Sequence, residues 1–253
     1  MNFTTLHHQD TPLLIANVWD ASSALAASEL GYPALGTSSA AIAAMLGYDD
    51  GEAMPFEELL YVVSRIRAVT RLPLSVDIEA GYSDTSEGII EHIQRLTQLG
   101  VVGINLEDSR VVAGIRHLED ASLFARTLSA VCAAYPELFV NVRTDTFLLG
   151  IDQPLQETLR RGQLYAACGA KGLFVPCVTA KEAIVTLAQE IPLPLNVISM
   201  PELARFATLA AWGVRRISMG NVLHSALQTT LKDLLSEVQA TQSFSGAFSH
   251  AGH

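Results

Sequence analysis

Hydrophobic and polar residues follow two alternating patterns along this chain. Short runs rich in valine, isoleucine and leucine are each followed by a longer stretch in which apolar residues recur every three or four positions. The first pattern predicts strands and the second predicts helices, and their succession is typical of a parallel sheet with helical crossovers. We expect strands at residues 13–18, 34–38, 74–78, 103–106, 139–143, 172–175, 195–198 and 216–219. We expect helices at residues 22–30, 56–69, 86–99, 121–135, 154–168, 180–189, 201–212 and 222–239.

The strand and helix units repeat with a period of roughly 30 residues. Several helices end in glycine, as at Gly100, Gly169 and Gly213, which suits a left-handed helix cap before the next strand. Eight such units favour a closed (β/α)8 barrel, a TIM barrel, over an open doubly wound α/β sheet. We expect residues 1–242 to form one barrel domain and residues 243–253 to form a flexible tail.

The composition supports a folded protein and narrows its partners. Hydrophobic residues make up 49% of the 253 residues and charged residues 17%, which argues against disorder. The net charge is -10 and there is no block of Lys and Arg, so nucleic acid is not an expected partner. The polar N-terminus lacks an export signal, no stretch suits a membrane span, and the three cysteines lack metal-binding spacing. We therefore expect a cytoplasmic protein with no membrane partner.

Three acidic residues lie at the predicted C-terminal ends of neighbouring strands. In a barrel these ends share one face, where residues that are distant in the sequence come together. Asp77 and Glu79 are two positions apart, so their carboxylates point to the same side, and Glu107 joins them from the next strand. Such carboxylates repel one another unless they share a cation, and hard oxygen ligands suit Mg2+ or Mn2+. The alternative for any one of them is a helix cap or a structural ion pair.

An arginine and two serines are candidates for binding a substrate. Arg143 ends an otherwise apolar strand, and its planar fork suits bidentate binding of a substrate carboxylate. The alternative for Arg143 is a salt bridge to Asp145 or Glu107. Ser38 and Ser39 follow the second strand, where backbone N–H groups can reach a ligand oxygen, although small residues also make ordinary turns.

Asp50 lies in the long connection between the second strand and the next predicted helix, beside Asp49 and Gly51. A mobile acidic loop over a barrel mouth can supply a group that handles a proton or completes a metal site. Two adjacent acids beside glycine are also common on solvated loops, so both interpretations stay open.

The residues at the strand ends resemble those of the isocitrate lyase and phosphoenolpyruvate mutase superfamily. The resemblance covers nearly the whole chain as an ordered set of segments, which is specific although each segment alone is not. The segments are Asn17-Val18-Trp19-Asp20, Gly36-Thr37-Ser38-Ser39, Asp77-Ile78-Glu79-Ala80-Gly81-Tyr82, Asn105-Leu106-Glu107-Asp108 and Asn141-Val142-Arg143-Thr144-Asp145.

This resemblance implies a metal site and a set of catalytic residues. Asp77 would hold Mg2+ largely through water, with Glu79 and Glu107 completing the acidic shell. Asp50 corresponds to a loop carboxylate near the metal, and Arg143 corresponds to the arginine that binds the substrate carboxylate. Asp50, Arg143 and Glu107 are therefore the expected catalytic residues.

The resemblance also implies the partners of the chain. Ser38, Ser39 and Trp19 correspond to residues that bind the keto-acid end of a small α-keto or hydroxy acid. Members of the superfamily are commonly homotetramers whose eighth helix packs on a neighbouring barrel, which implies a swapped C-terminal helix at residues 222–239.

Two differences from the usual superfamily sequence reduce the number of reactions that the chain is expected to catalyse. The usual pair of aspartates is here Asp77 and Glu79. The segment after Glu107, residues 108–118, lacks the K-[KR]-C-G-H motif of isocitrate and methylisocitrate lyases and the asparagine of the phosphonate mutases. The chain is most similar to the short-loop members that bind α-keto acids.

We expect a Mg2+-dependent carbon-carbon lyase that acts on a small 2-oxo or 2-hydroxy (di)carboxylic acid. Carbon-carbon cleavage or decarboxylation would leave an enolate that the metal stabilises. Asp50, or Arg116 and His117 from the short loop, would handle the proton. Two alternatives are a phosphonomutase or phosphonate hydrolase acting on a C–P bond, and a non-catalytic α-keto-acid-binding protein.

Overall fold

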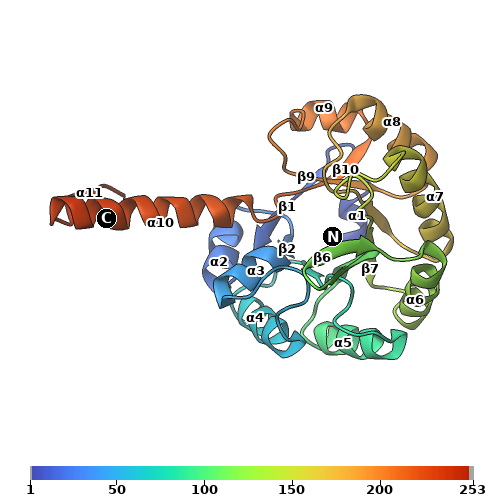
Figure 1. Cartoon of the computed structure of the whole chain (residues 1–253), viewed down its shortest axis with the longest axis horizontal. Helices are drawn as coiled ribbons and strands as arrows, with labels where there is room; N and C mark the ends of the chain where they lie inside the picture. Colours follow the sequence, from blue (N-terminus) through green and yellow to red (C-terminus); the bar gives the residue numbers. More distant parts are fainter. Residues whose placement is uncertain (1, 251–253) are drawn as a thin grey trace. The chain divides into compact units, whose positions relative to one another are not determined.

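Eight parallel strands close into a barrel in the computed structural model, which describes residues 2–250. The strands are β1 (Leu13–Val18), β2 (Leu35–Thr37), β3 (Leu74–Asp77), β4 (Gly103–Glu107), β7 (Phe139–Arg143), β8 (Gly172–Phe174), β9 (Leu195–Ile198) and β10 (Val214–Ser218). They pair in the order β1-β10-β9-β8-β7-β4-β3-β2, and β2 pairs with β1 to close the ring. The TIM barrel predicted from the sequence is confirmed (Figure 1).

Helices between the strands cover the outside of the barrel (Figure 1). They are α2 (Ala21–Glu29), α4 (Phe56–Val69), α5 (Ser86–Gln98), α6 (Ala121–Ala134), α7 (Pro154–Ala167), α8 (Lys181–Glu190) and α9 (Phe206–Ala211). Side-chain oxygens of Asp20, Thr85 and Asp120 accept hydrogen bonds from backbone N–H groups at the starts of α2, α5 and α6. These caps satisfy N–H groups that have no partner within the helix, and they fix where each strand-to-helix loop ends.

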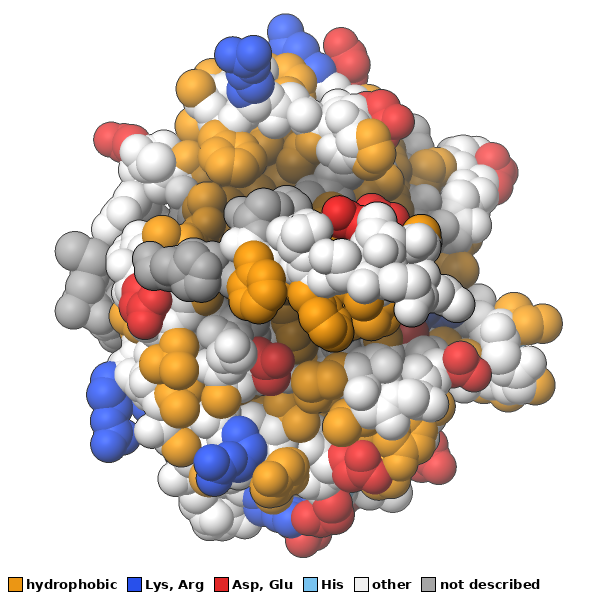
Figure 2. Space-filling view, turned by 90° about the vertical axis from the view of Figure 1, so that its left-hand side faces the viewer, with side chains coloured by type: hydrophobic (Ala, Val, Ile, Leu, Met, Phe, Trp, Pro, Cys, Tyr) orange, Lys and Arg blue, Asp and Glu red, His pale blue; other side chains and the backbone are white. Residues whose placement is uncertain are grey.

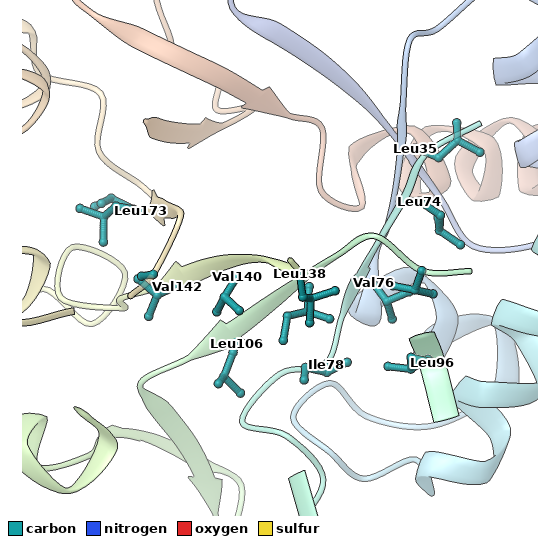
Figure 3. Packing of buried hydrophobic residues seen from close by; sticks show 14 of the residues in the cluster. Leu35, Leu74, Val76, Ile78, Leu96, Leu106, Leu138, Val140, Val142 and Leu173 are labelled. Carbon is teal, nitrogen blue, oxygen red and sulfur yellow. The ribbon is translucent and has the colours of Figure 1, made fainter. Parts of the chain in front are cut away.

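The main hydrophobic core lies between the strands and the helices. Alternate residues of each strand point outward, so Val76 packs in this core while its neighbours Ser75 and Asp77 point into the barrel. Figure 3 shows the packing of Leu35, Leu74, Val76, Ile78, Leu96, Leu106, Leu138, Val140, Val142 and Leu173. Each such fully buried side chain stabilises the fold by roughly 1.5–3 kcal/mol. The same alternation places the polar residues of the strands inside the barrel.

A short helix at the N-terminus closes one end of the barrel. α1 (Phe3–Leu6) buries Phe3 and Leu6 in a second hydrophobic cluster with Ile15 of β1 and Phe139 of β7. The sequence pattern did not predict this helix, because its four residues are too few to show a helical period. The apolar plug leaves the C-terminal ends of the strands as the polar end of the barrel.

Two further elements lie in the loops at the C-terminal ends of the strands. α3 (Ser39–Leu46) follows β2 directly, and an antiparallel hairpin of β5 (Ser109–Val112) and β6 (Ile115–Leu118) follows β4. The hairpin turns at Ala113 and Gly114, which both have positive φ angles, 51° and 78°. It forms a sheet of its own, separate from the barrel.

The chain divides into two compact units, residues 1–220 and residues 221–253, and the second is described here by itself. It contains α10 (Val222–Thr241) and α11 (Ser245–His250). The predicted tail, residues 243–253, thus includes a helix, and its last three residues lie outside those described. The predicted domain boundary at residue 242 and the flexibility of the tail stay predictions.

α10 carries a row of exposed leucines at intervals of four residues, namely Leu223, Leu227, Leu231 and Leu235. Figure 2 shows hydrophobic side chains interspersed with acidic ones on the face that it presents. Among the described helices, none is both long enough and apolar enough to cross a membrane.

Candidate active site

The ends of three adjacent strands bring the predicted acidic residues and the predicted arginine together. β3, β4 and β7 lie side by side, and the register pairs Glu107 with Arg143 and Asp77 with Asn105. Asp77, Glu107 and Arg143 are each the last residue of a strand. They alternate with outward-facing core residues, so their side chains meet at the polar end of the barrel.

Asp77 is buried and held by the residue that ends β2 and the residue that begins α3. Its Oδ2 accepts a hydrogen bond from Ser39 Oγ at 3.0 Å, and its backbone N–H donates to Thr37 Oγ1 at 2.8 Å. Burial raises the pKa of Asp77, and the positive charge of Arg143 opposes that rise. The structure thus presents a fixed, buried carboxylate that a cation would stabilise.

Glu79 turns the chain away from β3 in a left-handed conformation, with φ 49°. Its Oε1 accepts a hydrogen bond from the Tyr82 hydroxyl at 2.9 Å, and its Oε2 accepts one from the backbone N–H of Glu52 at 2.8 Å. Burial raises the pKa of Glu79 to about 7, and the charges of Asp50 and Asp77 add to this effect. Glu79 therefore fastens the loop that carries Asp50 to the barrel.

Glu107 lies between two arginines. Arg116 of β6 contacts Oε1, and Arg143 Nη1 lies 3.0 Å from Oε2. Glu107 is 2% exposed, and this burial raises its pKa although both guanidinium groups oppose the rise. The contact with Arg143 is not aligned as a hydrogen bond, and no described residue donates one to Oε2.

Arg143 directs its fork at a protein carboxylate. Its Nε and Nη2 donate to the two oxygens of Asp145 at 2.6 Å and 3.0 Å, while Nη1 faces Glu107. Burial by itself would lower the pKa of Arg143, but Glu107 and Asp145 raise it above its ordinary value. The structure therefore shows the salt bridges considered as the alternative from the sequence. The binding of a substrate carboxylate by Arg143 stays a prediction.

The predicted substrate-binding residues Ser38, Ser39 and Trp19 follow β2 and β1. Ser38 caps α3, because its hydroxyl oxygen accepts a hydrogen bond from the backbone N–H of Ala41 at 3.3 Å. Ser39 donates its hydroxyl to Asp77, as described above. Trp19 is buried, with 8% of its surface exposed. All three lie at the polar end of the barrel, and their contacts with a substrate stay predictions.

Asp50 is linked to the acidic cluster of Asp77, Glu79 and Glu107 through Arg116, which also contacts Glu107. Its side chain is 47% exposed, and its Oδ2 lies 3.3 Å from Arg116 Nη2. Gly51, with φ 106°, packs so closely on the hairpin that a Cβ atom there would lie 2.4 Å from Val111. The Asp50 loop and the hairpin are therefore in contact at the same side of the barrel mouth.

The hairpin supplies two arginines whose contacts the sequence did not reveal. Arg116 Nη1 also donates to Ser109 Oγ at 3.0 Å, inside the acidic cluster. On the other strand, Arg110 donates to the backbone oxygen of Ser83 at 2.9 Å and forms an ion pair with Glu119. Arg110 fastens the hairpin to the barrel and Arg116 reaches into the site. The signal in the sequence was an arginine on each side of the Ala-Gly turn.

A buried network behind the site was also missed. Asp108 Oδ2 accepts hydrogen bonds from Arg161 Nη1 at 2.8 Å, Thr144 Oγ1 at 2.7 Å and the Tyr165 hydroxyl at 2.8 Å. Its Oδ1 accepts a hydrogen bond from the backbone N–H of Asp145 at 3.2 Å. The network therefore fixes the backbone after β7, which holds the partner of Arg143. No local signal in the sequence joins Asp108 to Arg161, which is 53 residues away.

The acidic residues fit a cation that is held largely through water. The part of the chain that the structure describes has no group of three His, Cys, Asp or Glu side chains placed to hold a metal ion directly. Asp77, Glu79 and Glu107 nevertheless offer hard oxygens, their pKa values are raised, and Glu107 Oε2 lacks a hydrogen-bond donor. Mg2+ keeps several waters in its sites, so carboxylates that do not bind it directly as a group can still hold it through those waters.

Known proteins share both the sequence and the fold of this chain. A family model for phosphoenolpyruvate phosphomutase matches residues 3–239. An uncharacterized protein of Mycobacterium tuberculosis (H37Rv) is 36% identical, over 89% of this chain and 84% of that protein. The oxaloacetate decarboxylase of Pseudomonas syringae pv. tomato is 27% identical, over 93% of this chain and 83% of that protein.

Solved structures agree with these relatives. A protein of Burkholderia cenocepacia J2315, provisionally named a phosphonomutase, has a TM-score of 0.87 at 38% identity, over 92% of this chain and 97% of that chain. A phosphonopyruvate hydrolase in complex with oxalate and Mg2+ has a TM-score of 0.88 at 17% identity, over 100% and 92% of the two chains, a likeness of fold. The match to the family model spans the barrel and all the site residues described above. The chain belongs to the phosphoenolpyruvate phosphomutase family, whose members and relatives include lyases and mutases.

Proposed function

We propose that this protein is a Mg2+-dependent decarboxylase of a small 2-oxo dicarboxylic acid, with oxaloacetate as the first candidate. The observation that carries the proposal is the meeting of two arginines, Arg143 and Arg116, on Glu107 beside Asp77. Two cations next to an acidic metal site suit a substrate with two carboxylates. The oxaloacetate decarboxylases among the relatives support the same substrate class.

The acidic residues would hold the cofactor at the strand ends. Asp77 would bind Mg2+, or Mn2+ in its place, and Glu79 and Glu107 would hold its waters. The bound cation would supply positive charge beside the keto oxygen of the substrate, where negative charge grows in the reaction. Ser39 keeps the carboxylate of Asp77 oriented by its hydrogen bond of 3.0 Å.

Each of the two arginines would bind one carboxylate of the substrate. Arg143 stands on a barrel strand and is held by Asp145, so it is a fixed anchor for the carboxylate next to the keto group. Arg116 stands on the hairpin, and one of its partners is the half-exposed Asp50. Arg116 can therefore leave Asp50 and bind the second carboxylate when the substrate enters.

Decarboxylation in this site needs only one proton from the protein. The bond between C3 and the departing carboxylate breaks, its electron pair forms the C2–C3 double bond of an enolate, and CO2 leaves. A proton added to C3 then gives pyruvate. Asp50 is the best-placed donor, because alternation along β6 directs the exposed His117 away from Arg116 and the site.

Turnover of oxaloacetate by the purified protein tests this proposal. Pyruvate is measured with lactate dehydrogenase, with and without Mg2+, against the spontaneous decarboxylation in the same buffer. We expect a Mg2+-dependent rate that an Asp50→Asn variant reduces by about 10²–10⁴-fold, the usual contribution of an acid or base. The absence of any rate above that of the buffer control, for oxaloacetate, 2-methylisocitrate and 2,3-dimethylmalate alike, would refute the carbon-carbon lyase.

A second candidate is chemistry at a C–P bond. It is supported by the 38% identical relative that is provisionally named a phosphonomutase. Release of phosphate from phosphonopyruvate would favour this candidate. Conversion of phosphoenolpyruvate into phosphonopyruvate would favour it as well. Stabilisation by oxalate and Mg2+ with no turnover of any substrate would instead favour a keto-acid-binding protein.

We further propose that the active form is a homotetramer in which α10 packs on a neighbouring barrel. The support is the row of exposed leucines on α10, since such rows are seldom left in water. Light scattering on the eluting protein should give four times the mass of 27.2 kDa. A monomer that is active at the same concentration would refute the assembly.

A further inference from the structure

Arg216 lies inside the barrel, below the acidic residues of the site. It is the middle residue of β10, and its neighbour Ile217 packs outward in the core, so Arg216 points inward. Its Nη2 donates to Asn105 Oδ1 at 3.4 Å. Asn105 lies two residues before Glu107 on β4, which places the guanidinium roughly 7 Å beneath the end of that strand.

The charge of Arg216 has no carboxylate partner among the described residues. Only 1% of its surface is exposed, and no described residue accepts a hydrogen bond from its Nε or Nη1. Arg161, the arginine of the network behind the site, is also buried, but it forms ion pairs with Asp108 and Glu157 and donates to the backbone oxygen of Glu119. Arg161 is built as a structural arginine and Arg216 is not.

The groups around Arg216 are polar but neutral. Asn105, Asn141 and Asn196 are joined by hydrogen bonds of 2.9 Å across the barrel interior. On the N-terminal side, burial and the charge of Arg216 lower the pKa of His7 to about 3, so His7 is uncharged at neutral pH. Burial lowers the pKa of Arg216 itself to about 10, which leaves it charged, and Asp77 opposes the shift.

A buried cation without a carboxylate partner is costly, and large costs of this kind are concentrated at functional sites. The groups that surround the Arg216 guanidinium are the neutral asparagines of the barrel interior and, toward the N-terminal end of the barrel, the uncharged His7. Among the charged groups of the described residues, Asp77 is the one whose charge favours the Arg216 cation, and an anion bound above would add to this effect. The proposed substrate is such an anion.

We propose that Arg216 is a positioning residue, a fixed internal cation that strengthens the binding of the anionic substrate and weakens the binding of the metal alone. The proposal rests on the proposed function in that it takes the ligand to be a keto acid bound with Mg2+. Its two effects have opposite signs, because one positive charge attracts a dianion and repels a divalent cation. A role in packing alone would not produce opposite shifts.

An Arg216→Met variant removes the charge and keeps much of the side-chain volume, while Arg216→Lys keeps the charge. The binding of Mn2+ alone is measured by electron paramagnetic resonance. The binding of oxalate is measured by calorimetry at saturating Mg2+. Unit charges about 10 Å apart at an effective dielectric constant of 20 alter an affinity on the order of tenfold. We therefore expect Mn2+ to bind Arg216→Met at least threefold more tightly and oxalate to bind at least threefold more weakly, with Arg216→Lys close to the wild type.

Arg161→Met serves as the matched control, because it removes a paired arginine from the same barrel. We expect it to lower the unfolding midpoint in urea without opposite shifts in the two affinities, whereas Arg216→Met keeps or raises that midpoint. If Arg216→Met does not fold, Arg216→Gln is measured in the same way. Shifts of the same sign, or no shift in a folded variant, overturn the role of Arg216. Failure of the wild type to bind oxalate would instead contradict the proposed function, and the Mn2+ result would still test Arg216.

Discussion

Replacing Arg116 by methionine separates recognition of the second carboxylate from the integrity of the metal site. Methionine retains most of the apolar stem of arginine but removes the contacts with Glu107, Asp145 and Asp50. A hydrogen bond to a charged group contributes about 1.5–3 kcal/mol. If Arg116 exchanges its contact with Asp50 for one with the second carboxylate, the variant should lose about 10- to 150-fold in kcat/KM for oxaloacetate.

The assay compares a ligand that has the second group with one that lacks it. Oxalate is long enough to match only the keto-acid end of oxaloacetate. Under the proposed function its inhibition constant should therefore change less than about threefold, a small energy beside that of a charged hydrogen bond. Arg116→Lys should recover part of the loss because it keeps the charge without the fork. Arg126→Met, an exposed arginine on α6, controls for the change in net charge. Equal weakening of oxalate and oxaloacetate would refute the reasoning, because Arg116 would then act only by ordering Glu107.

Three other predictions follow from the same contacts. The pKa of Glu79 is raised to about 7, so the folded state favours its protonated form. The resulting contribution to the free energy of unfolding is complete below about pH 4.5 and is lost as the pH rises through 7. Urea unfolding in EDTA should therefore show stability falling by up to about 3 kcal/mol between pH 5 and 8, and Glu79→Gln should flatten the curve. Asp77→Ala should abolish the rise in melting temperature that Mg2+ causes, whereas a full rise in that variant would exclude Asp77 as the metal ligand. Arg161→Met leaves Asp108 buried without its cation, which should cost about 3–5 kcal/mol in urea unfolding, and a cost below about 1 kcal/mol would contradict the structural role of that pair.

The barrel could be predicted because its signals are local and repeated. β1, β7, β9 and α4 begin and end where the hydrophobic pattern places them. α9 begins at Phe206, five residues later than expected, because the chain turns at Met200–Leu203 before the helix starts. The hydrophobic pattern does not predict α3, because its apolar run has no polar face to mark a helical period. Ser38 caps this helix and Gly47 ends it in a left-handed conformation.

The candidate site was predictable only in part. Alternation along the strands was enough to bring Asp77, Glu107 and Arg143 together. It could not show that Arg143 would be engaged by Asp145, because two residues after a strand can turn in many directions. The hairpin was missed because its turn is Ala-Gly, whereas Asn-Gly or Asp-Gly would have signalled it. The positions of Arg116 and Arg161 depend on contacts between distant segments, which no local pattern records.

The β5–β6 hairpin has a consequence for protein engineering. Its two strands pair only with each other, and its base is closed by the hydrogen bond from the Glu119 N–H to the Asp108 backbone oxygen at 2.8 Å. The chain therefore leaves and rejoins the barrel at nearly the same point. We therefore expect that residues 109–118, which include Arg110 and Arg116, can be exchanged for the corresponding loop of a relative without changing the strand order or the helical shell. A library of such exchanges would vary the substrate that the barrel accepts while the acidic cluster beneath stays constant.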